Sequence, residues 1–262
     1  MKKAVKISGV ILGVILIIAL VIFIFFPGIF TYFKVKHKYS HIDDSLGKFE
    51  KLIVPDAFDA FTINGVKLKM PYGSKRQTYD LTYTDGSIGQ IASDIIRYKD
   101  EITILTKKSS LSEMKKLSEQ ASELIELSDT EEEFSEDEFR HYFNSVDEPM
   151  PLNSTERIWY NKNKLKASDC LRLRGKDMEV FKYLAECKDD AYDAEITYIN
   201  DIPGCDCYVS QNLLEEFKGN LWSVFIYPEN DEDTYYYVMI RGKDEETIKQ
   251  IISSIELKGG TK

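Results

Sequence analysis

The chain has 262 residues, of which 43% are apolar and 12% aromatic, and its 44 acidic and 34 basic residues give a net charge of −10 at pH 7. This composition supplies enough apolar material for a packed core and excludes a disordered chain. So acidic a chain is a poor match for nucleic acid, because phosphates are neutralised by Lys and Arg. No G-x-G-x-x-G or G-x-x-x-x-G-K-[ST] pattern is present, so nucleotide binding has no support and no cofactor is expected.

The N-terminal region contains an uncharged apolar run from Ile7 to Phe26. At about 1.5 Å per residue, a helix over this run would be roughly 30 Å long, which matches the hydrocarbon core of a bilayer. A cleaved signal peptide usually has an apolar region of about 7 to 15 residues and a small-residue cleavage site, and the run shows neither. The pattern therefore predicts a single-pass transmembrane helix over residues 7–26, acting as an uncleaved signal anchor in the cell membrane.

The lysines around this run are evenly divided, so their number does not set the orientation of the helix. Those before the run lie next to it, whereas those after it begin only at Lys34. Proximity favours residues 1–6 in the cytoplasm, residues 27–57 as a juxtamembrane stalk and residues 58–257 as an extracytoplasmic domain. The lysines concerned are Lys2, Lys3, Lys6, Lys34, Lys36 and Lys38.

The first part of the domain is expected to be mostly extended. Two short alternating runs within residues 61–73 flank Asn64-Gly65, which is the strongest short-range signal for a β-hairpin. Residues 79–84 and 102–106 also have strand patterns. Residues 91–98, by contrast, are predicted to form a short helix.

Two helices with capping boxes follow. Ser110 and Glu113 form the first box, ahead of apolar residues at helical spacing, and Ser135 and Glu138 form the second. Residues 147–155 contain two prolines and no periodicity, which predicts a linker and a sub-boundary of the domain. The first helix has a stripe of Met114, Leu117, Ala121, Leu124 and Ile125, and the second has Phe134 and Phe139 placed as a hydrophobic staple.

The C-terminal part combines strands and helices. Helical segments are predicted over 177–188, 212–217 and 244–255, and strands over 195–199 and 205–209. The runs 222–227 and 235–241 alternate and are joined by a polar tip, which predicts a long hairpin. Strands that follow one another through turns indicate an antiparallel sheet, so the expected fold class is α+β, with helices flanking the sheet. The last helix presents Ile248, Ile251, Ile252 and Ile255 on one face.

The segment from Ile196 to Leu257 resembles the end of PsbP-like domains in its Gly-containing hairpin, its long strand pair and its final helix of the form x-x-I-x-x-I-I-x-S-I. The run from Phe61 to Gly73 is similar to the opening strands of such domains, in which a proline follows the second strand. The helices expected between Leu111 and Val146 depart from the family layout. The resemblance implies a non-catalytic binding or assembly module, and it carries over no functional residues.

Four cysteines outside the cytoplasm would be able to form disulfides. Cys205 and Cys207 point to the same face of an extended strand, and a bond between them would close a small, strained ring. The remaining pairings join them to Cys170 and Cys187 in either order, each closing a loop of about 20 to 40 residues.

Free thiols in the core are the alternative to these disulfides. A zinc site is disfavoured because the cysteine spacings of 17, 18 and 2 residues differ from those of C-x₂₋₄-C knuckles. No C-x-x-C motif supports redox catalysis. The four cysteines are therefore expected to contribute stability rather than chemistry.

The histidines and the acidic tip give only weak signals. His37 and His41 would share one face of a helix and could supply two of the four ligands of a metal site. Such histidines are more often solvated. His141 has no serine in a G-x-S-x-G turn to act on. Residues 228–233 offer oxygen atoms of the kind that calcium prefers, without the EF-hand spacing. No metal site and no catalytic residue is therefore predicted.

These observations favour a membrane-anchored, extracytoplasmic, non-enzymatic binding or assembly module of a bacterial-type cell envelope, with a protein partner in the envelope. Two alternatives remain open. One is an immunity-type protective protein that binds a secreted toxin with its acidic surface. The other is an envelope hydrolase whose site is not recognised.

Overall fold

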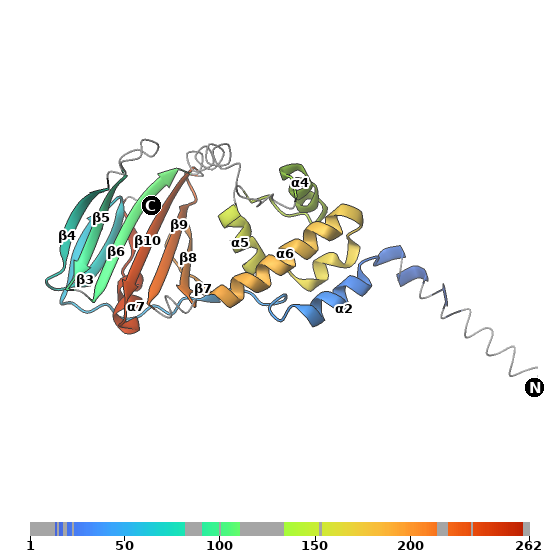
Figure 1. The fold of residues 1–262 in the computed structure, drawn as a ribbon, viewed down its shortest axis with the longest axis horizontal. Coiled ribbons are helices and arrows are strands. Elements are labelled where there is room, and N and C mark those ends of the chain that lie inside the picture. The colour runs from blue at the N-terminus through green and yellow to red at the C-terminus, as the bar shows by residue number, and fades with distance from the viewer. Residues whose placement is uncertain are drawn as a thin grey trace, which may run out of the picture. The chain divides into compact units, whose positions relative to one another are not determined.

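The computed structural model describes residues 14, 16–17, 20–22, 24–81, 91–99, 101–110, 134–151, 154–213, 220–231 and 233–258. The chain divides into two compact units. Unit 1 combines residues 1–45 with residues 128–191, and unit 2 combines residues 46–127 with residues 192–262. The described part of unit 1 is helical, and the described strands belong to unit 2 (Figure 1).

The helices of unit 1 begin where the sequence supplies caps. At the start of α4 the Ser135 hydroxyl accepts a hydrogen bond from the Glu138 N–H, and the Glu138 carboxylate accepts one from the Ser135 N–H at 2.7 Å. The rings of Phe134 and Phe139 lie 6.1 Å apart, so the predicted capping box and staple are confirmed. The elements are α2 (Ile29–Lys38), α4 (Glu136–Ser145), α5 (Ser154–Asn163), the 3₁₀ helix η1 (Ala167–Arg172) and α6 (Gly175–Ala194).

The core of unit 1 is rich in aromatic rings. Phe139, Tyr142 and Phe143 of α4 are fully buried in one cluster with Phe181 of α6. Val35 of α2 lies in the same cluster, so α2 is packed onto the unit by one face. The aromatic stripe of α4 is therefore core, as its helical spacing predicts.

Unit 2 contains two sheets. The larger has eight strands in the order β1-β7-β8-β9-β10-β6-β5-β4, and the smaller has three in the order β11-β3-β2. The strands are β1 (Gly47–Lys48), β2 (Phe58–Ile63), β3 (Val66–Pro71), β4 (Lys75–Leu81), β5 (Ile91–Tyr98), β6 (Ile102–Ser110), β7 (Glu195–Ile199), β8 (Cys205–Asn212), β9 (Leu221–Pro228), β10 (Thr234–Gly242) and β11 (Glu256–Leu257).

The larger sheet is mixed, which corrects the predicted antiparallel sheet. β1 runs parallel to β7, with Gly47 opposite Tyr198, whereas the other described neighbours are antiparallel. Turn signals predict only the pairing of strands that are adjacent in sequence. β1 and β7 are far apart in the chain, so no turn could have revealed their pairing.

One apolar cluster joins both sheets of unit 2 to the helix α7 (Glu245–Ser253). Side chains on one face of β9 and β10 alternate into this cluster, including the fully buried Trp222 and Ile240. The hairpin predicted from 222–227 and 235–241 is confirmed, with Val238 opposite Val224. The predicted isoleucine face of the last helix is confirmed too, because Ile248 and Ile252 are fully buried.

Residues 91–98 form the strand β5, so the predicted helix is wrong. Ile96 of β5 is fully buried and lies opposite Arg76 of β4 on one side and Ile104 of β6 on the other. The backbone pairing of β5 with β4 and with β6 outweighs the intrinsic helix preference of these residues. That preference differs by only about 1 kcal/mol per residue at most among non-proline residues. The helix predicted after Ser110, residues 82–84 and most of the predicted turn at 212–217 lie outside the described residues.

The described ranges contain no helix that has both the length and the apolar character to span a bilayer. This finding corrects the prediction of a transmembrane helix over residues 7–26. Residues 7–13, 15, 18–19 and 23 of that run lie outside the described residues. The helix α2, in the predicted stalk, has 10 residues and a basic last turn.

Gly28 sets the contact between the start of α2 and η1. The Gly28 N–H donates to the Leu171 carbonyl at 3.1 Å. The Gly28 carbonyl accepts a hydrogen bond from the Tyr32 N–H at 2.8 Å. A Cβ atom at this position would lie 1.8 Å from the Cys170 carbonyl oxygen. Because that oxygen belongs to the backbone, only a glycine allows the two segments to approach so closely.

We expect Gly28→Ala to lower the free energy of unfolding of unit 1 by about 2 to 3 kcal/mol, because the methyl group forces α2 away from η1. Denaturant unfolding followed by the fluorescence of the buried Trp159, in a Trp222→Phe background, measures this loss. Gly47→Ala in unit 2, read through Trp222 in a Trp159→Phe background, is the control for a glycine-to-alanine change without a clash, since its Cβ would meet nothing closer than 3.7 Å. Equal midpoints for the Gly28→Ala variant and its parent would show that the contact is not tight.

Candidate functional site

The four cysteines are free thiols, so the predicted disulfides are wrong. Cys205 and Cys207 do share one face of β8, with the exposed Asp206 between them, as strand alternation predicts. Cys207 lies in the core of unit 2, and Cys170 lies in the core of unit 1. Cys205 packs against the same cluster as Cys207, so these thiols contribute apolar packing rather than cross-links.

Burial makes these thiols poor nucleophiles. It raises the pKa of Cys207 to about 12 and that of Cys170 to about 11. Burial also raises the pKa of Cys187 and that of Cys205. Because the thiolate is the reactive form, none of the four is suited to thiol chemistry at neutral pH.

Two of the three histidines lie within hydrogen-bond distance of a carboxylate. The Nδ1 atom of His41 lies 2.8 Å from Asp44, and that of His141 lies 2.6 Å from Asp177, which links α4 to the first turn of α6. His37 is exposed on α2. The part of the chain that the structure describes brings no three metal-ligating side chains together, so His37 and His41 do not gain the further ligands that a site would need.

The acidic tip between β9 and β10 uses two of its carboxylates to hold the turn. Asp231 accepts a hydrogen bond from the Thr234 N–H at 3.2 Å, and Asp233 accepts one from the Ser110 hydroxyl at 2.7 Å. These bonds close the hairpin onto the end of β6. The carboxylates therefore have a structural role that does not require a calcium ion.

A buried lysine organises the turn that follows α2. The Lys188 ammonium, on α6, is fully buried and donates to the carbonyl oxygens of Ile42 at 3.0 Å, Asp44 at 2.7 Å and Leu165 at 2.8 Å. Lys166 reaches the same turn from outside and donates to the Asp44 carbonyl at 3.0 Å. The three carbonyl oxygens offset part of the cost of burying the Lys188 charge.

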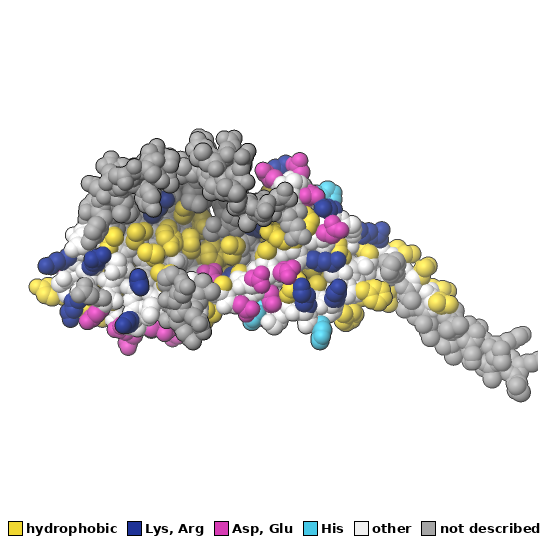
Figure 2. Space-filling model, in the orientation of Figure 1, with side chains coloured by type: hydrophobic (Ala, Val, Ile, Leu, Met, Phe, Trp, Pro, Cys, Tyr) yellow, Lys and Arg dark blue, Asp and Glu magenta, His cyan; other side chains and the backbone are white. Residues whose placement is uncertain are grey.

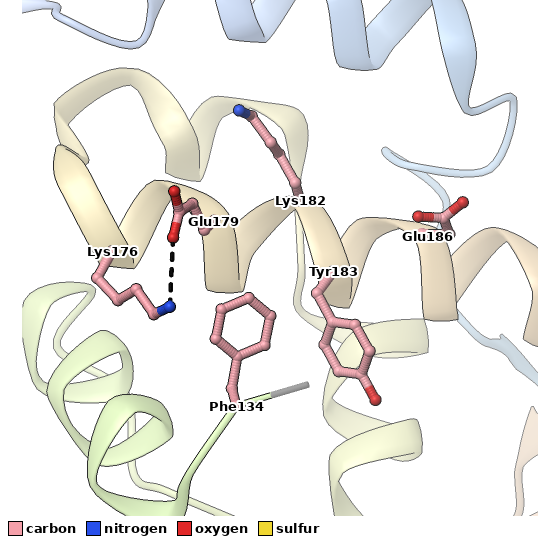
Figure 3. A pocket seen from close by; sticks show the side chains of 6 residues that line it. All are labelled: Phe134, Lys176, Glu179, Lys182, Tyr183 and Glu186. Atoms are coloured by element: carbon pink, nitrogen blue, oxygen red, sulfur yellow. Dashed lines mark ion pairs between the residues drawn. The ribbon is translucent and has the colours of Figure 1, made fainter. Parts of the chain in front are cut away.

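A groove of about 370 Å³ lies along α6 (Figure 3). The rings of Phe134 and Tyr183 form its floor, 5.5 Å apart, and the Lys176 ammonium lies 5.0 Å from the Phe134 ring. Lys176 also pairs with Glu179 at 3.5 Å. The groove thus carries two lysines and two glutamates, of which Lys176 and Glu179 pair along the helix, as is typical of a solvated helix face. Its lining consists of Phe134, Lys176, Glu179, Lys182, Tyr183 and Glu186.

The face of the larger sheet that points away from the core carries aromatic rings. Hydrophobic side chains gather over the middle strands of this sheet in Figure 2. Phe225 and Tyr237 lie directly opposite each other with ring centroids 4.9 Å apart, and Tyr227 stacks on Tyr235 at 6.0 Å. Cross-strand aromatic pairs of this kind stabilise a sheet, and we assign them to that role.

The smaller sheet ends at β2, whose strand neighbour within the described ranges is β3 alone. Opposite residues of an antiparallel pair alternate between exchanging backbone hydrogen bonds and pointing those groups away from each other. The Lys69 N–H donates to the Ser254 hydroxyl at 2.8 Å, on the side of β3 away from β2. Its partner Ala60, and by the same alternation Thr62, therefore direct their N–H and C=O groups to the open edge, and both residues are exposed.

Asp59 lies at the same edge, on the face of the sheet that carries the core residue Ile63. The residue is half-buried, and its carboxylate accepts one long, exposed hydrogen bond, from the Gly73 N–H at 3.4 Å. Within the described residues no lysine or arginine forms an ion pair with it. A carboxylate without a cation at an open edge favours the approach of a positive group.

Sequence reasoning predicted the β2–β3 hairpin and missed its open edge. The signal that could have revealed the edge is the composition of β2, which has no lysine, no proline and one charged residue.

Neither the protein-family models nor the curated proteins include a match to this chain, so the resemblance to PsbP-like domains gains no support from them.

The buried lysine makes the stability of unit 1 depend on pH. Burial, and then the nearby charge of Lys166, lower the pKa of Lys188 to about 8 from an ordinary value of 10.5. Between these values the unfolded chain binds more protons at this position than the folded chain. The contribution of Lys188 to the free energy of unfolding therefore rises with pH from about 8 to about 10.5.

We expect Lys188→Met to lower the free energy of unfolding at pH 7 by about 2 kcal/mol, because it leaves buried carbonyl oxygens without their donor. The difference from the parent should grow by about 2 kcal/mol between pH 8 and pH 10. Trp159 fluorescence during denaturation reports both values. Lys182→Met, on the exposed side of α6, is the control. A difference that stays constant or shrinks with rising pH would contradict the lowered pKa.

Proposed function

We propose that the chain is a non-catalytic binding module that takes up an extended segment of a protein partner along β2. The observation that carries the proposal is the outward direction of the N–H and C=O groups of Ala60 and Thr62 at a sheet edge. Such groups can pair with another strand, which is how several peptide-binding domains recognise their partners. Backbone pairing gives affinity without any catalytic group.

The composition of β2 supports this proposal. Proteins commonly protect sheet edges with lysines, prolines, bulges or very short strands. β2 has six residues, Phe58 to Ile63, without a lysine or a proline, and Asp59 is its one charged residue. The strand is also held firmly, since it pairs with β3 over its whole length. A rigid, regular edge needs little reorganisation before a second strand can pair with it.

The titratable groups of the described residues support a binding role over a catalytic one. The thiols have raised pKa values, and the buried ammonium of Lys188 is occupied by three carbonyl oxygens. Those groups hold the fold together. The predicted position of the domain outside the cytoplasm of a bacterial-type cell, and the alternative roles as an immunity-type protein or a hydrolase, stay predictions.

Photo-crosslinking in cells that make the full chain tests the proposal. With p-benzoylphenylalanine at position 62, we expect an adduct with another protein. Ala60→Pro should reduce the adduct at least about tenfold, because proline removes an N–H that points to the partner but donates nothing to β3. Ala60→Ser keeps that N–H and should keep the adduct.

Two outcomes would overturn the proposal. One is an adduct that persists at full yield in the Ala60→Pro chain, and the other is an adduct that contains only two copies of this chain. Loss of folding is checked separately through Trp222, which is fully buried in unit 2. Its unfolding transition, in a Trp159→Phe background, should be the same in the Ala60→Pro and Ala60→Ser chains.

A further inference from the structure

The pairing of β2 with β3 places Asp59, Phe61 and Ile63 on one face of the strand. The β3 residues opposite them, Met70, Leu68 and Val66, are fully buried in the core of unit 2. This face of the smaller sheet therefore belongs to the apolar cluster. A strand added beside β2 would extend the same face by one row of side chains.

Burial decreases along this face of β2. Ile63, next to the turn, is 2% exposed, whereas Phe61 and Asp59 are only half-buried. Phe61 packs against the apolar cluster from its edge. Since neighbouring strands lie about 4.8 Å apart, a residue opposite Phe61 on an added strand would cover the exposed side of its ring. An apolar side chain fits that position best.

Asp59 imposes a different requirement on the added strand. Its carboxylate lies at the rim of an apolar cluster, and the Gly73 N–H at 3.4 Å is its hydrogen-bond donor among the described residues. Opposite charges on directly opposed residues stabilise a strand pair, and like charges destabilise it. A lysine or arginine opposite Asp59 supplies the missing cation, whereas a glutamate or aspartate there is rejected.

The other face of β2 carries no charged side chain of its own. Ala60 and Thr62 are small and exposed, and the β3 residues opposite them are Lys69 and Lys67, of which Lys67 is paired with Glu256 at 2.8 Å. The chain as a whole carries a net charge of −10, which favours the approach of a basic segment and disfavours a second copy of itself.

We infer that the partner of β2 is an extended basic segment of another protein, with a lysine or arginine opposite Asp59 and an apolar residue two positions away, opposite Phe61. This inference rests on the proposed strand addition and adds the chemistry of the partner. The basic residue opposite Asp59 and the apolar residue opposite Phe61 are two positions apart whether the segment runs parallel or antiparallel to β2. In either direction, alternate residues of a strand lie on the same face.

Charge variants of Asp59 test the inference in the same full-chain crosslinking assay. We expect Asp59→Asn to lower the yield of the adduct about threefold and Asp59→Lys to lower it at least about tenfold. Asp56→Lys, an exposed position three residues earlier, makes the same change of charge outside the strand and should leave the yield unchanged. The crosslinked peptide, read by mass spectrometry, should contain a lysine or arginine two positions from an apolar residue.

A rescue experiment follows from the sequence of that peptide. Changing its basic residue to glutamate should restore the adduct with the Asp59→Lys chain and weaken the adduct with the parent chain. Full yield from Asp59→Lys, together with loss of the adduct in Ala60→Pro, would overturn the basic-partner inference while leaving strand addition intact. Full yield in both variants would overturn both.

Discussion

The two-residue turn at Asn64 and Gly65 is the constraint on which the rest of unit 2 depends. Both residues have positive φ, 51° and 86°, which is the conformation that a tight hairpin turn with the correct twist requires. The Asn64 side chain donates to the Thr106 carbonyl at 2.8 Å, and so ties the turn to β6 of the larger sheet. The Gly65 carbonyl accepts the Lys258 N–H at 2.8 Å, which ties the residue after β11 to the same turn.

This turn also fixes which groups of β2 face outward. A two-residue turn allows one register, and a slip by one residue would move every side chain of β2 to the opposite face. In the observed register Ile63 and Phe61 point to the core, and the backbone groups of Ala60 and Thr62 point to the open edge. The proposed binding edge and the packing of the core are therefore two consequences of a single local structure.

Gly65 is held close to the larger sheet as well. A Cβ atom there would lie 3.0 Å from the Tyr236 ring of β10, so the turn and the ring are in tight contact. The smaller sheet is thus fastened to the larger one by a side-chain hydrogen bond and by close packing at the same place. Such a support keeps β2 rigid, which lowers the entropy that a partner strand would have to overcome.

The features that could be predicted from the sequence are local ones. The Asn64-Gly65 turn, the Ser135 capping box and the isoleucine face around Ile252 depend on residues close together in the chain, and all three are confirmed. The wrong or missed features depend on distant residues. β5 is a strand because of its neighbours β4 and β6, and β1 pairs with β7 across most of the chain.

The candidate site was missed for the same reason. Whether Ala60 faces an open edge depends on which strand lies beside β2, and no local pattern contains that information. The burial of Lys188 likewise depends on carbonyl oxygens from two separate segments. The cysteines were assigned to disulfides from their number and spacing, which do not show where the side chains lie, and all four are free thiols.

Amide hydrogen exchange of the full chain, read residue by residue by NMR, tests the central claim most directly. The account predicts that the N–H groups of Ala60 and Thr62 exchange nearly as fast as unprotected amides. Those of Phe61 and Ile63, which donate to β3, should be slower by about 100-fold or more. Equal protection of all four amides in the isolated chain would show that the edge of β2 is already paired, and would contradict the account.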